Sequence, residues 1–248
     1  MSKVMLITGA SRGIGAATAR LAARQGYRVI VNYQRNRDAA DALVESIITL
    51  GGEALAVQAD VADQDQVRRL FAAIDERLGR LDVLVNNAGM LEQQMRLERM
   101  SLERWQRVFA TNVYGSFLCS REAIARMSTR QGGRGGAIVN VSSIAARLGA
   151  PGEYIDYAAA KGAVDSMTVG LAKELADDGI RVNAVRPGVI DTEIHASGGE
   201  PQRVARVAAS IPLGRGGRAE EVAEAILWLA GEQASYTTGS LLDVSGGR

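Results

Sequence analysis

Short apolar runs alternate with longer stretches of helical periodicity along most of the chain. The runs of strand length are Val4–Ile7, Arg28–Val31, Ala54–Gln58, Leu81–Val85, Ala137–Val141 and Arg181–Val185. The helical stretches between them are Ala16–Gln25, Asp38–Leu50, Gln64–Leu78, Leu102–Met127 and Ile155–Leu171. Regular alternation of this kind predicts a doubly wound parallel sheet with helices on both faces, a three-layer α/β/α fold. Because no repeat, low-complexity tract or linker interrupts the pattern, we expect a single domain over residues 1–248.

The first strand runs directly into a glycine-rich stretch, Thr8-Gly9-Ala10-Ser11-Arg12-Gly13-Ile14-Gly15, and then into a helix. A strand, a glycine-rich turn and a helix bring backbone amides and a helix N-terminus to a pyrophosphate, as in a Rossmann-type fold. A plain strand–helix turn is the alternative. No Gly-Lys-Ser/Thr ending follows, so the sequence does not indicate a nucleoside-triphosphate P-loop.

Three further stretches follow strands, where the ligand site of such a sheet lies. They are Asn86–Gly89, Ser142-Ser143 and the segment from Pro187 to Thr192. Beyond Thr192, the residues from His195 to Pro201 have the composition of a loop. We expect residues 191–213 to form a substrate lid that leads into a short helix. A plain surface excursion fits this segment equally well.

Composition narrows the classes of function. The chain has 29 Lys and Arg against 28 Asp and Glu, so no basic surface for nucleic acid or acidic lipid is indicated. Its single Cys cannot form an internal disulfide, which suits a reducing compartment. The first apolar run is too short for a signal peptide or membrane span, so we expect a cytoplasmic protein. Cys119 and the single His195 are too far apart in the chain for a metal-ligand motif, and we predict no metal.

Tyr157 and Lys161 are four residues apart in a helical stretch, so their side chains share one helix face. Only three of the 29 basic residues are Lys, and one of them occupies this position. An ammonium beside a phenol favours the phenolate and lowers its pKa toward the range of efficient proton transfer. The pair therefore suggests a general acid/base and its activator. The alternative is a surface Tyr packed on the stem of a Lys.

Taken together these motifs resemble the short-chain dehydrogenase/reductase family. The resemblance is carried by Thr8-Gly9-x-x-x-Gly13-x-Gly15, Asn86-Asn87-Ala88-Gly89, Asn112, Ser143, Tyr157-x-x-x-Lys161 and Pro187-Gly188. It extends from Lys3 to Ser245-Gly246-Gly247. Within the family the chain is similar to bacterial glucose/ribitol-dehydrogenase-like and 3-oxoacyl-carrier-protein-reductase-like members.

The resemblance implies hydride transfer between a nicotinamide and a carbonyl or alcohol carbon. Tyr157 would exchange the proton, Lys161 would lower its pKa and bind the nicotinamide ribose, and Ser143 would hold the substrate oxygen. Ser142 competes with Ser143, because alternation along a strand lets only one of them face the site. Asn112 would anchor a water that relays protons from Lys161. The implied cofactor contacts are Gly9, Ser11, Arg12, Gly13, Ile14, Gly15, Tyr33, Gln34, Arg35, Asp60, Val61, Asn87, Ala88, Gly89, Tyr157, Lys161, Pro187, Gly188, Ile190 and Thr192.

The choice of dinucleotide depends on the end of the second strand. An NAD site of this fold carries an Asp or Glu there for the ribose 2′-hydroxyl. The stretch Asn32-Tyr33-Gln34-Arg35-Asn36 holds no carboxylate, and the first one, Asp38, has the place of a helix N-cap. Arg35 and Arg12 are available for a 2′-phosphate. We therefore predict NADP, with NAD possible.

The leading hypothesis is an NADP-dependent oxidoreductase that acts on a sugar, polyol or small ketone. The alternatives are a 3-oxoacyl-carrier-protein reductase, a non-catalytic NADP-binding sensor and, more weakly, a methyltransferase. A hydrolase built on Ser143, His195 and Asp191 is disfavoured because Ser143 does not lie in a Gly-x-Ser-x-Gly motif. The helix after Tyr157 is apolar nearly all round, so we expect it to meet Leu102–Met127 of another subunit in a homotetramer.

Overall fold

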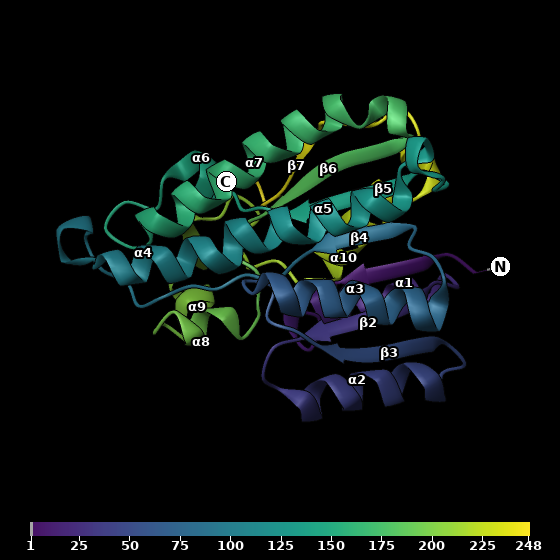
Figure 1. Ribbon diagram of the computed structural model, residues 1–248. Helices are drawn as coiled ribbons and strands as arrows, with labels where there is room; N and C mark the ends of the chain where they lie inside the picture. Colours follow the sequence, from purple (N-terminus) through teal and green to yellow (C-terminus); the bar gives the residue numbers. More distant parts are fainter. Residues whose placement is uncertain (1) are drawn as a thin grey trace.

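The computed structural model describes residues 2–248, and a seven-stranded sheet runs through it (Figure 1). The strands are β1 (Val4–Ile7), β2 (Arg28–Tyr33), β3 (Glu53–Gln58), β4 (Val83–Asn86), β5 (Gly136–Val141), β6 (Ile180–Pro187) and β7 (Leu241–Val244). All are parallel, in the order β3-β2-β1-β4-β5-β6-β7. The chain direction across the sheet reverses at β1 and β4, so the loops after these two strands diverge and leave a crevice.

Helices cover both faces of the sheet (Figure 1). One face carries α1 (Gly13–Arg24), α2 (Arg37–Thr49) and α10 (Ala219–Ala230), and the other carries α3 (Gln64–Leu78), α5 (Gly115–Met127) and α7 (Ile155–Glu174). The remaining helices are α4 (Leu102–Phe109), α6 (Ala145–Leu148), α8 (Ile194–Ser197) and α9 (Arg203–Val207). This arrangement confirms the predicted three-layer α/β/α fold of Rossmann type.

The apolar character of the strands follows from this double coverage. In β1 the side chains of Met5 and Ile7 join one core cluster, while Val4 and Leu6 join the other. All four residues are fully buried. A strand that is covered on both faces shows a continuous apolar run rather than alternation, which is why β1, β4 and β5 were recognisable in the sequence.

Three local expectations are corrected by the structure, and two of its elements have no counterpart in the sequence analysis. The helix predicted over Leu102–Met127 is interrupted by a π-helical turn at Ala110–Tyr114. The N-cap of α2 is Asn36, whose side chain accepts from the backbone N–H of Ala39 at 3.1 Å, and Asp38 lies within the first turn. The segment from His195 to Pro201 is not all loop, because it contains most of α8. Finally, α10 and β7 were not predicted, although both complete the sheet and its cover.

No helix within residues 2–248 is long and apolar enough to cross a membrane. In the same residues no three His, Cys, Asp or Glu side chains are grouped so that they could hold a metal ion. Cys119 is buried in α5, and burial raises the pKa of its thiol to about 12. It packs as a small apolar residue.

Candidate active site

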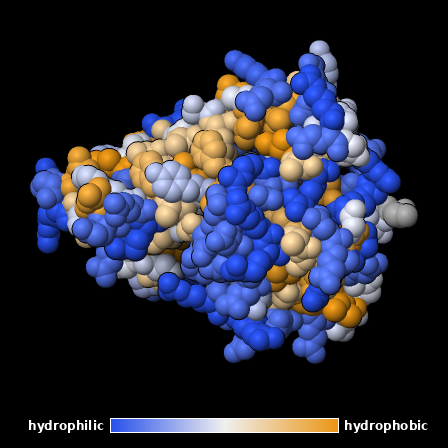
Figure 2. Space-filling model, viewed as in Figure 1, coloured by the Kyte–Doolittle hydropathy of each residue, from blue (hydrophilic) through white to orange (hydrophobic). Residues whose placement is uncertain are grey.

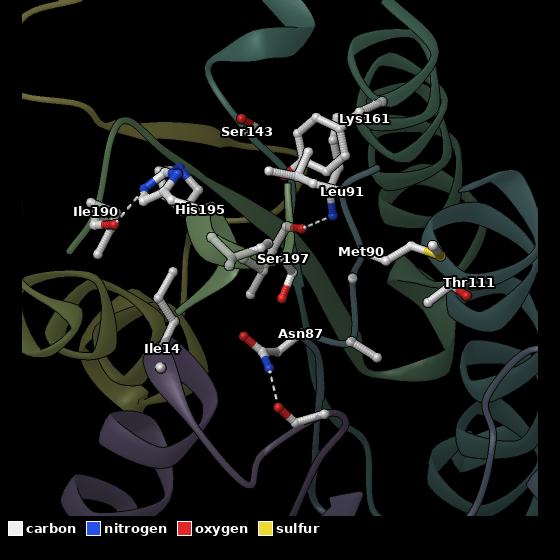
Figure 3. A pocket seen from close by; sticks show the side chains of 18 of the residues that line it. Ile14, Asn87, Met90, Leu91, Thr111, Ser143, Lys161, Ile190, His195 and Ser197 are labelled. Atoms are coloured by element: carbon white, nitrogen blue, oxygen red, sulfur yellow. Dashed lines mark hydrogen bonds between the residues drawn. The ribbon is translucent and has the colours of Figure 1, made fainter. Parts of the chain in front are cut away.

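A cavity of about 970 Å³ opens at the carboxyl edge of the sheet. The loops after β1 to β6 line it, together with the start of α7, the short helix α8 and the final residue, Arg248. Figure 3 shows this cavity from close by, with Ile14 and Asn87 on one side and Ser143, Lys161 and His195 on another. The elements that the motifs occupy therefore converge on one space, at the place where a doubly wound sheet binds its ligand.

The glycine-rich turn packs so closely on the loop after β4 that side chains would not fit at two of its positions. Gly9 and Gly13 have φ of +60° and +55°, a conformation that residues with a Cβ rarely adopt. A Cβ on Gly9 would lie 2.9 Å from the Cα of Ala88, and one on Gly15 would lie 2.5 Å from Nδ2 of Asn87. The turn leads directly into the N-terminus of α1, whose free amides suit a pyrophosphate. These features fit a dinucleotide.

Side chains lock the turn to the end of β4. Thr8 Oγ1 accepts from the backbone N–H groups of Asn87 and Ala88, both at 3.0 Å. Asn87 Nδ2 donates back to the carbonyls of Thr8 and Gly9 at 2.8 and 3.0 Å. Asn32, at the end of β2, accepts from the N–H of Gly9 at 3.2 Å. The conformation of the phosphate-binding turn is therefore fixed from two neighbouring strands.

Ser143, Tyr157 and Lys161 all line the cavity. Lys161 is buried, its Nζ donates to the carbonyl of Val141 at 2.8 Å, and it lies 5.5 Å from the centre of the Tyr157 ring (Figure 3). Ser142 Oγ donates to the backbone carbonyl of Lys161 at 3.1 Å, so its hydroxyl is used in joining β5 to α7. Ser143 Oγ instead accepts from the backbone N–H of Ala145 at 3.1 Å, which leaves its hydroxyl proton free to be donated. The geometry thus favours Ser143 over Ser142 as the residue that faces a substrate.

The expected lowering of the Tyr157 pKa by Lys161 is not found in the protein alone. Burial raises the pKa of Tyr157 to about 12, against the opposing effect of its hydrogen bond with Ser143. Burial also lowers the pKa of Lys161 to about 8, against the opposing charge of Asp165. The reason is geometric, because the ammonium bonds to Val141 and lies over the Tyr157 ring. Desolvation therefore outweighs the attraction between the two groups.

Asn112 lies in the π-helical turn between α4 and α5 and is fully buried. Its Nδ2 donates to the carbonyls of Val108 at 2.9 Å and Met90 at 3.1 Å, and its Oδ1 accepts from the N–H of Met90 at 3.2 Å. The side chain thereby holds the loop after β4 against the helix. A Cβ on Gly89 would lie 3.0 Å from Oδ1 of Asn112 and 3.6 Å from Nζ of Lys161, so the three residues are close together.

Most of the predicted contacts line the cavity, and three do not. Those that line it are Gly9, Ser11, Arg12, Gly13, Ile14, Tyr33, Gln34, Arg35, Asp60, Val61, Asn87, Ala88, Gly89, Ser143, Tyr157, Lys161, Pro187, Gly188 and Ile190. Asn112, Gly15 and Thr192 do not line it. Gly15 packs against Asn87, and the side chain of Thr192 lies where a Cβ on Gly13 would come within 3.3 Å.

An ion-pair cluster that no local sequence pattern indicates lies beside the cavity, and two of its members, Glu153 and Arg203, line it. We call Glu153, Glu200, Arg203 and Arg206 the lid cluster. Arg203 pairs with Glu153 at 2.5 Å and with Glu200 at 3.2 Å, and Arg206 pairs with both carboxylates. The guanidinium of Arg203 also lies 5.2 Å from the ring centre of Tyr154. The cluster fastens residues 200–206 to the segment before α7, across about 50 residues of sequence that no local pattern connects.

A glycine-rich turn and a Ser–Tyr–Lys set around one cavity of a doubly wound sheet define a class, the nicotinamide-dependent oxidoreductases. Comparison with known proteins agrees. A family model described as Enoyl-(Acyl carrier protein) reductase matches residues 9–248. The chain belongs to the short-chain dehydrogenase/reductase family. It is an enzyme of this type and binds a nicotinamide cofactor.

Its relatives have related names. The Uncharacterized oxidoreductase YgfF of Escherichia coli (strain K12) is 58% identical over 245 residues, which cover 99% of each chain. A 3-oxoacyl-acyl-carrier-protein reductase of Synechocystis is 45% identical over 248 residues, covering 99% of this chain and 96% of the other. A crystal structure of the 3-ketoacyl-acyl-carrier-protein reductase from Brucella melitensis, complexed with NADH, has a TM-score of 0.91 at 35% identity. That match covers 99% of this chain and 98% of the other.

Proposed function

We propose that the chain is an NADP-dependent oxidoreductase that interconverts a carbonyl and a secondary alcohol, acting on a sugar, polyol or small ketone. The observation that supports it most directly is the convergence of Ser143, Tyr157 and Lys161 on the cavity that the glycine-rich turn also lines. A nucleotide sensor would have no use for a partly buried phenol beside a buried ammonium. The bound nicotinamide would supply or accept the hydride.

The chain's own residues would handle the proton and the orientation of the substrate. Ser143 would hold the substrate oxygen by a hydrogen bond, and Tyr157 would give its proton to the developing alkoxide or take it back in the reverse direction. Lys161 would bind the nicotinamide ribose and stabilise the phenolate of Tyr157. Asn112 would anchor a water that relays protons from Lys161. Residues 191–213 would act as a lid, which the lid cluster holds against the segment before α7.

The preference for NADP is supported by charge. Arg12 and Arg35 are both exposed and line the cavity, and no carboxylate follows β2 until Asp38. The neighbouring ion pair uses Arg37 and Asp41, at 3.3 Å. Two guanidinium groups match a 2′-phosphate geometrically and electrostatically. One observation argues against a preference for NADP: the similar structure from Brucella melitensis is a complex with NADH.

A second candidate is reduction of a 3-oxoacyl group on an acyl-carrier protein, which the name of the relative at 45% identity suggests. We further propose that the protein is a cytoplasmic homotetramer. Initial rates of NADPH and NADH oxidation with a panel of ketones, sugars and a 3-oxoacyl thioester test the two candidate functions together. Turnover of ketones or sugars with NADPH is expected. A rate restricted to the thioester would favour the second candidate, and no rate with any substrate would contradict both.

A further inference from the structure

One polar atom of the cavity wall has no partner. Seven buried side-chain nitrogen and oxygen atoms within residues 2–248 lack a hydrogen-bond partner, and they belong to Arg28, Arg80, Asn86, Trp105, Asp165, Asp178 and His195. Of these residues only His195 lines the cavity. The orphaned atom is its Nδ1. Buried polar atoms are paired in most folded proteins, so an exception in a ligand cavity points to a ligand.

The imidazole is fixed as an acceptor. Its Nε2 lies 2.8 Å from the carbonyl oxygen of Ile190, which can only accept, so Nε2 carries the proton and Nδ1 keeps its lone pair. Burial lowers the pKa of His195, against the opposing effect of its hydrogen bond with Ile190, and this favours the neutral ring. Figure 3 shows His195 bonded to Ile190 through one nitrogen, with the other turned away from it.

Three polar side chains near His195 already donate to hydrogen-bond or ion-pair partners within the protein. Ser197 Oγ donates to the carbonyl of Glu193 at 3.4 Å, and Tyr154 Oη donates to the carbonyl of Gly198 at 3.3 Å. Arg203 is held by the two carboxylates of the lid cluster. Their donors serve the protein itself, and among the buried side-chain atoms on this wall His195 Nδ1 is the one without a hydrogen-bond partner. A ligand group that donates a hydrogen bond to Nδ1 would give this atom its missing partner.

We propose that His195 Nδ1 accepts a hydrogen bond from a hydroxyl of the substrate, so that the site selects carbonyl compounds carrying a second hydroxyl, such as hydroxyketones and sugars. The inference rests on the proposed function and narrows its substrate class. Because wall atoms cover Nδ1, the substrate reaches it by a small displacement of α8. That helix is four residues long and is followed by Gly198 and Gly199, the latter at φ +83°.

Two variants separate this role from the bond to Ile190. The amide of His195→Gln replaces Nε2 and keeps a donor toward Ile190, but offers no acceptor at the position of Nδ1. The amide of His195→Asn offers an acceptor at the position of Nδ1 but no donor toward Ile190. The substrates are 3-hydroxybutan-2-one and 3-methylbutan-2-one, which differ in shape only by a hydroxyl in place of a methyl group. The readout is the ratio of their kcat/KM values, with the dissociation constant of NADPH measured in parallel.

The wild type is expected to prefer the hydroxyketone, His195→Gln to lose about 3–10-fold of that ratio, and His195→Asn to retain most of it. Three results overturn the proposal: a wild type that does not prefer the hydroxyketone, a ratio that survives in His195→Gln, or a ratio that falls equally in both variants. A wild type that reduces neither ketone also overturns the inference, whereas the proposed function is contradicted only if the wider panel of ketones and sugars gives no rate either, so the two failures are distinguishable.

Discussion

Arg104 and Asp156 form a buried ion pair that joins α4 to the first turn of α7. Nε and NH2 of Arg104 donate to the two oxygens of Asp156 at 2.6 and 3.2 Å, and NH1 donates to the carbonyl of Gln93 at 2.5 Å. The side chains are 4% and 1% exposed. Asp156 also accepts from the backbone N–H of Tyr157 at 2.9 Å. One pair therefore fixes the start of the helix that carries the candidate acid/base.

Removing one partner of this pair should be costly. Arg104→Ala would leave a buried carboxylate uncompensated, and we expect unfolding free energy to fall by about 3–5 kcal/mol in urea titrations. Arg37→Ala is the matched control, because its pair with Asp41 has side chains 77% and 55% exposed. That control should change stability by less than about 1 kcal/mol. Equal losses in the two variants would mean that the buried pair has no special role.

The fold was predictable because the physical signal is repeated. Fully buried strands such as β1 and β4 give continuous apolar runs, and helices on both faces give the period between them. β7 is not evident in the sequence because none of its four residues is buried, so its residue pattern is not that of a core strand. The helical pattern of α10, by contrast, is legible in the sequence, with Val222, Ile226 and Leu229 on its buried side.

The candidate site was predictable where chemistry is local and not where it depends on distant contacts. The spacing of Tyr157 and Lys161 and the glycine turn are local patterns, and the residues meet as expected in one cavity. The lid cluster joins Glu153 to Arg203 and Arg206, and no periodicity connects these positions. The pKa of Tyr157 was wrongly anticipated for the protein alone, because helix spacing places side chains on a face but does not give their desolvation.

The role of Tyr157 can be tested by removing a single oxygen. Tyr157→Phe is expected to lower kcat by about 10²–10⁴-fold, as for loss of a general acid/base, with NADPH affinity close to wild type. Tyr114→Phe removes the same atom from a side chain that is largely exposed, and should leave kcat unchanged. Steady-state rates and fluorescence titration of cofactor measure the two quantities. A Phe variant that turns over at the wild-type rate would exclude Tyr157 as the proton donor.

Lys161 should make stability depend on alkaline pH. Its pKa is lowered to about 8 in the folded chain from an ordinary value of 10.5, so above pH 8 the unfolded state binds the proton more tightly. Stability attributable to this residue should therefore rise with pH, by about 2–3 kcal/mol between pH 8 and 10. Lys161→Met should lack that rise in urea titrations, whereas the exposed control Lys173→Met should keep it. Parallel pH curves for wild type and Lys161→Met would argue against a buried, depressed lysine.

The molecular mass of the protein in solution tests the proposed homotetramer. Apolar side chains gather in a band over α4, α5 and α7 in Figure 2, and Tyr114 and Phe117 in this region are 58% and 50% exposed. We expect light scattering at micromolar concentration to give four times the 26.3 kDa mass of the chain. Phe117→Glu should lower that mass, because a charge would be buried in the contact. Leu50→Glu, at the end of α2, is the control and should not. A monomeric wild type would end this proposal.

The choice of dinucleotide rests on Arg35, which lines the cavity beyond the end of β2. A charged hydrogen bond to a 2′-phosphate is worth about 1.5–3 kcal/mol, so Arg35→Asp should lower kcat/KM for NADPH by on the order of 10–100-fold. The rate with NADH should hold or rise, because the new carboxylate can accept from the ribose 2′-hydroxyl. Arg37→Asp makes the same charge change two residues away, outside the cavity lining, and controls for the general electrostatic field. Equal losses in both variants would mean that Arg35 acts only through the general electrostatic field and does not bond to the 2′-phosphate. A wild type that prefers NADH would remove the basis for proposing NADP.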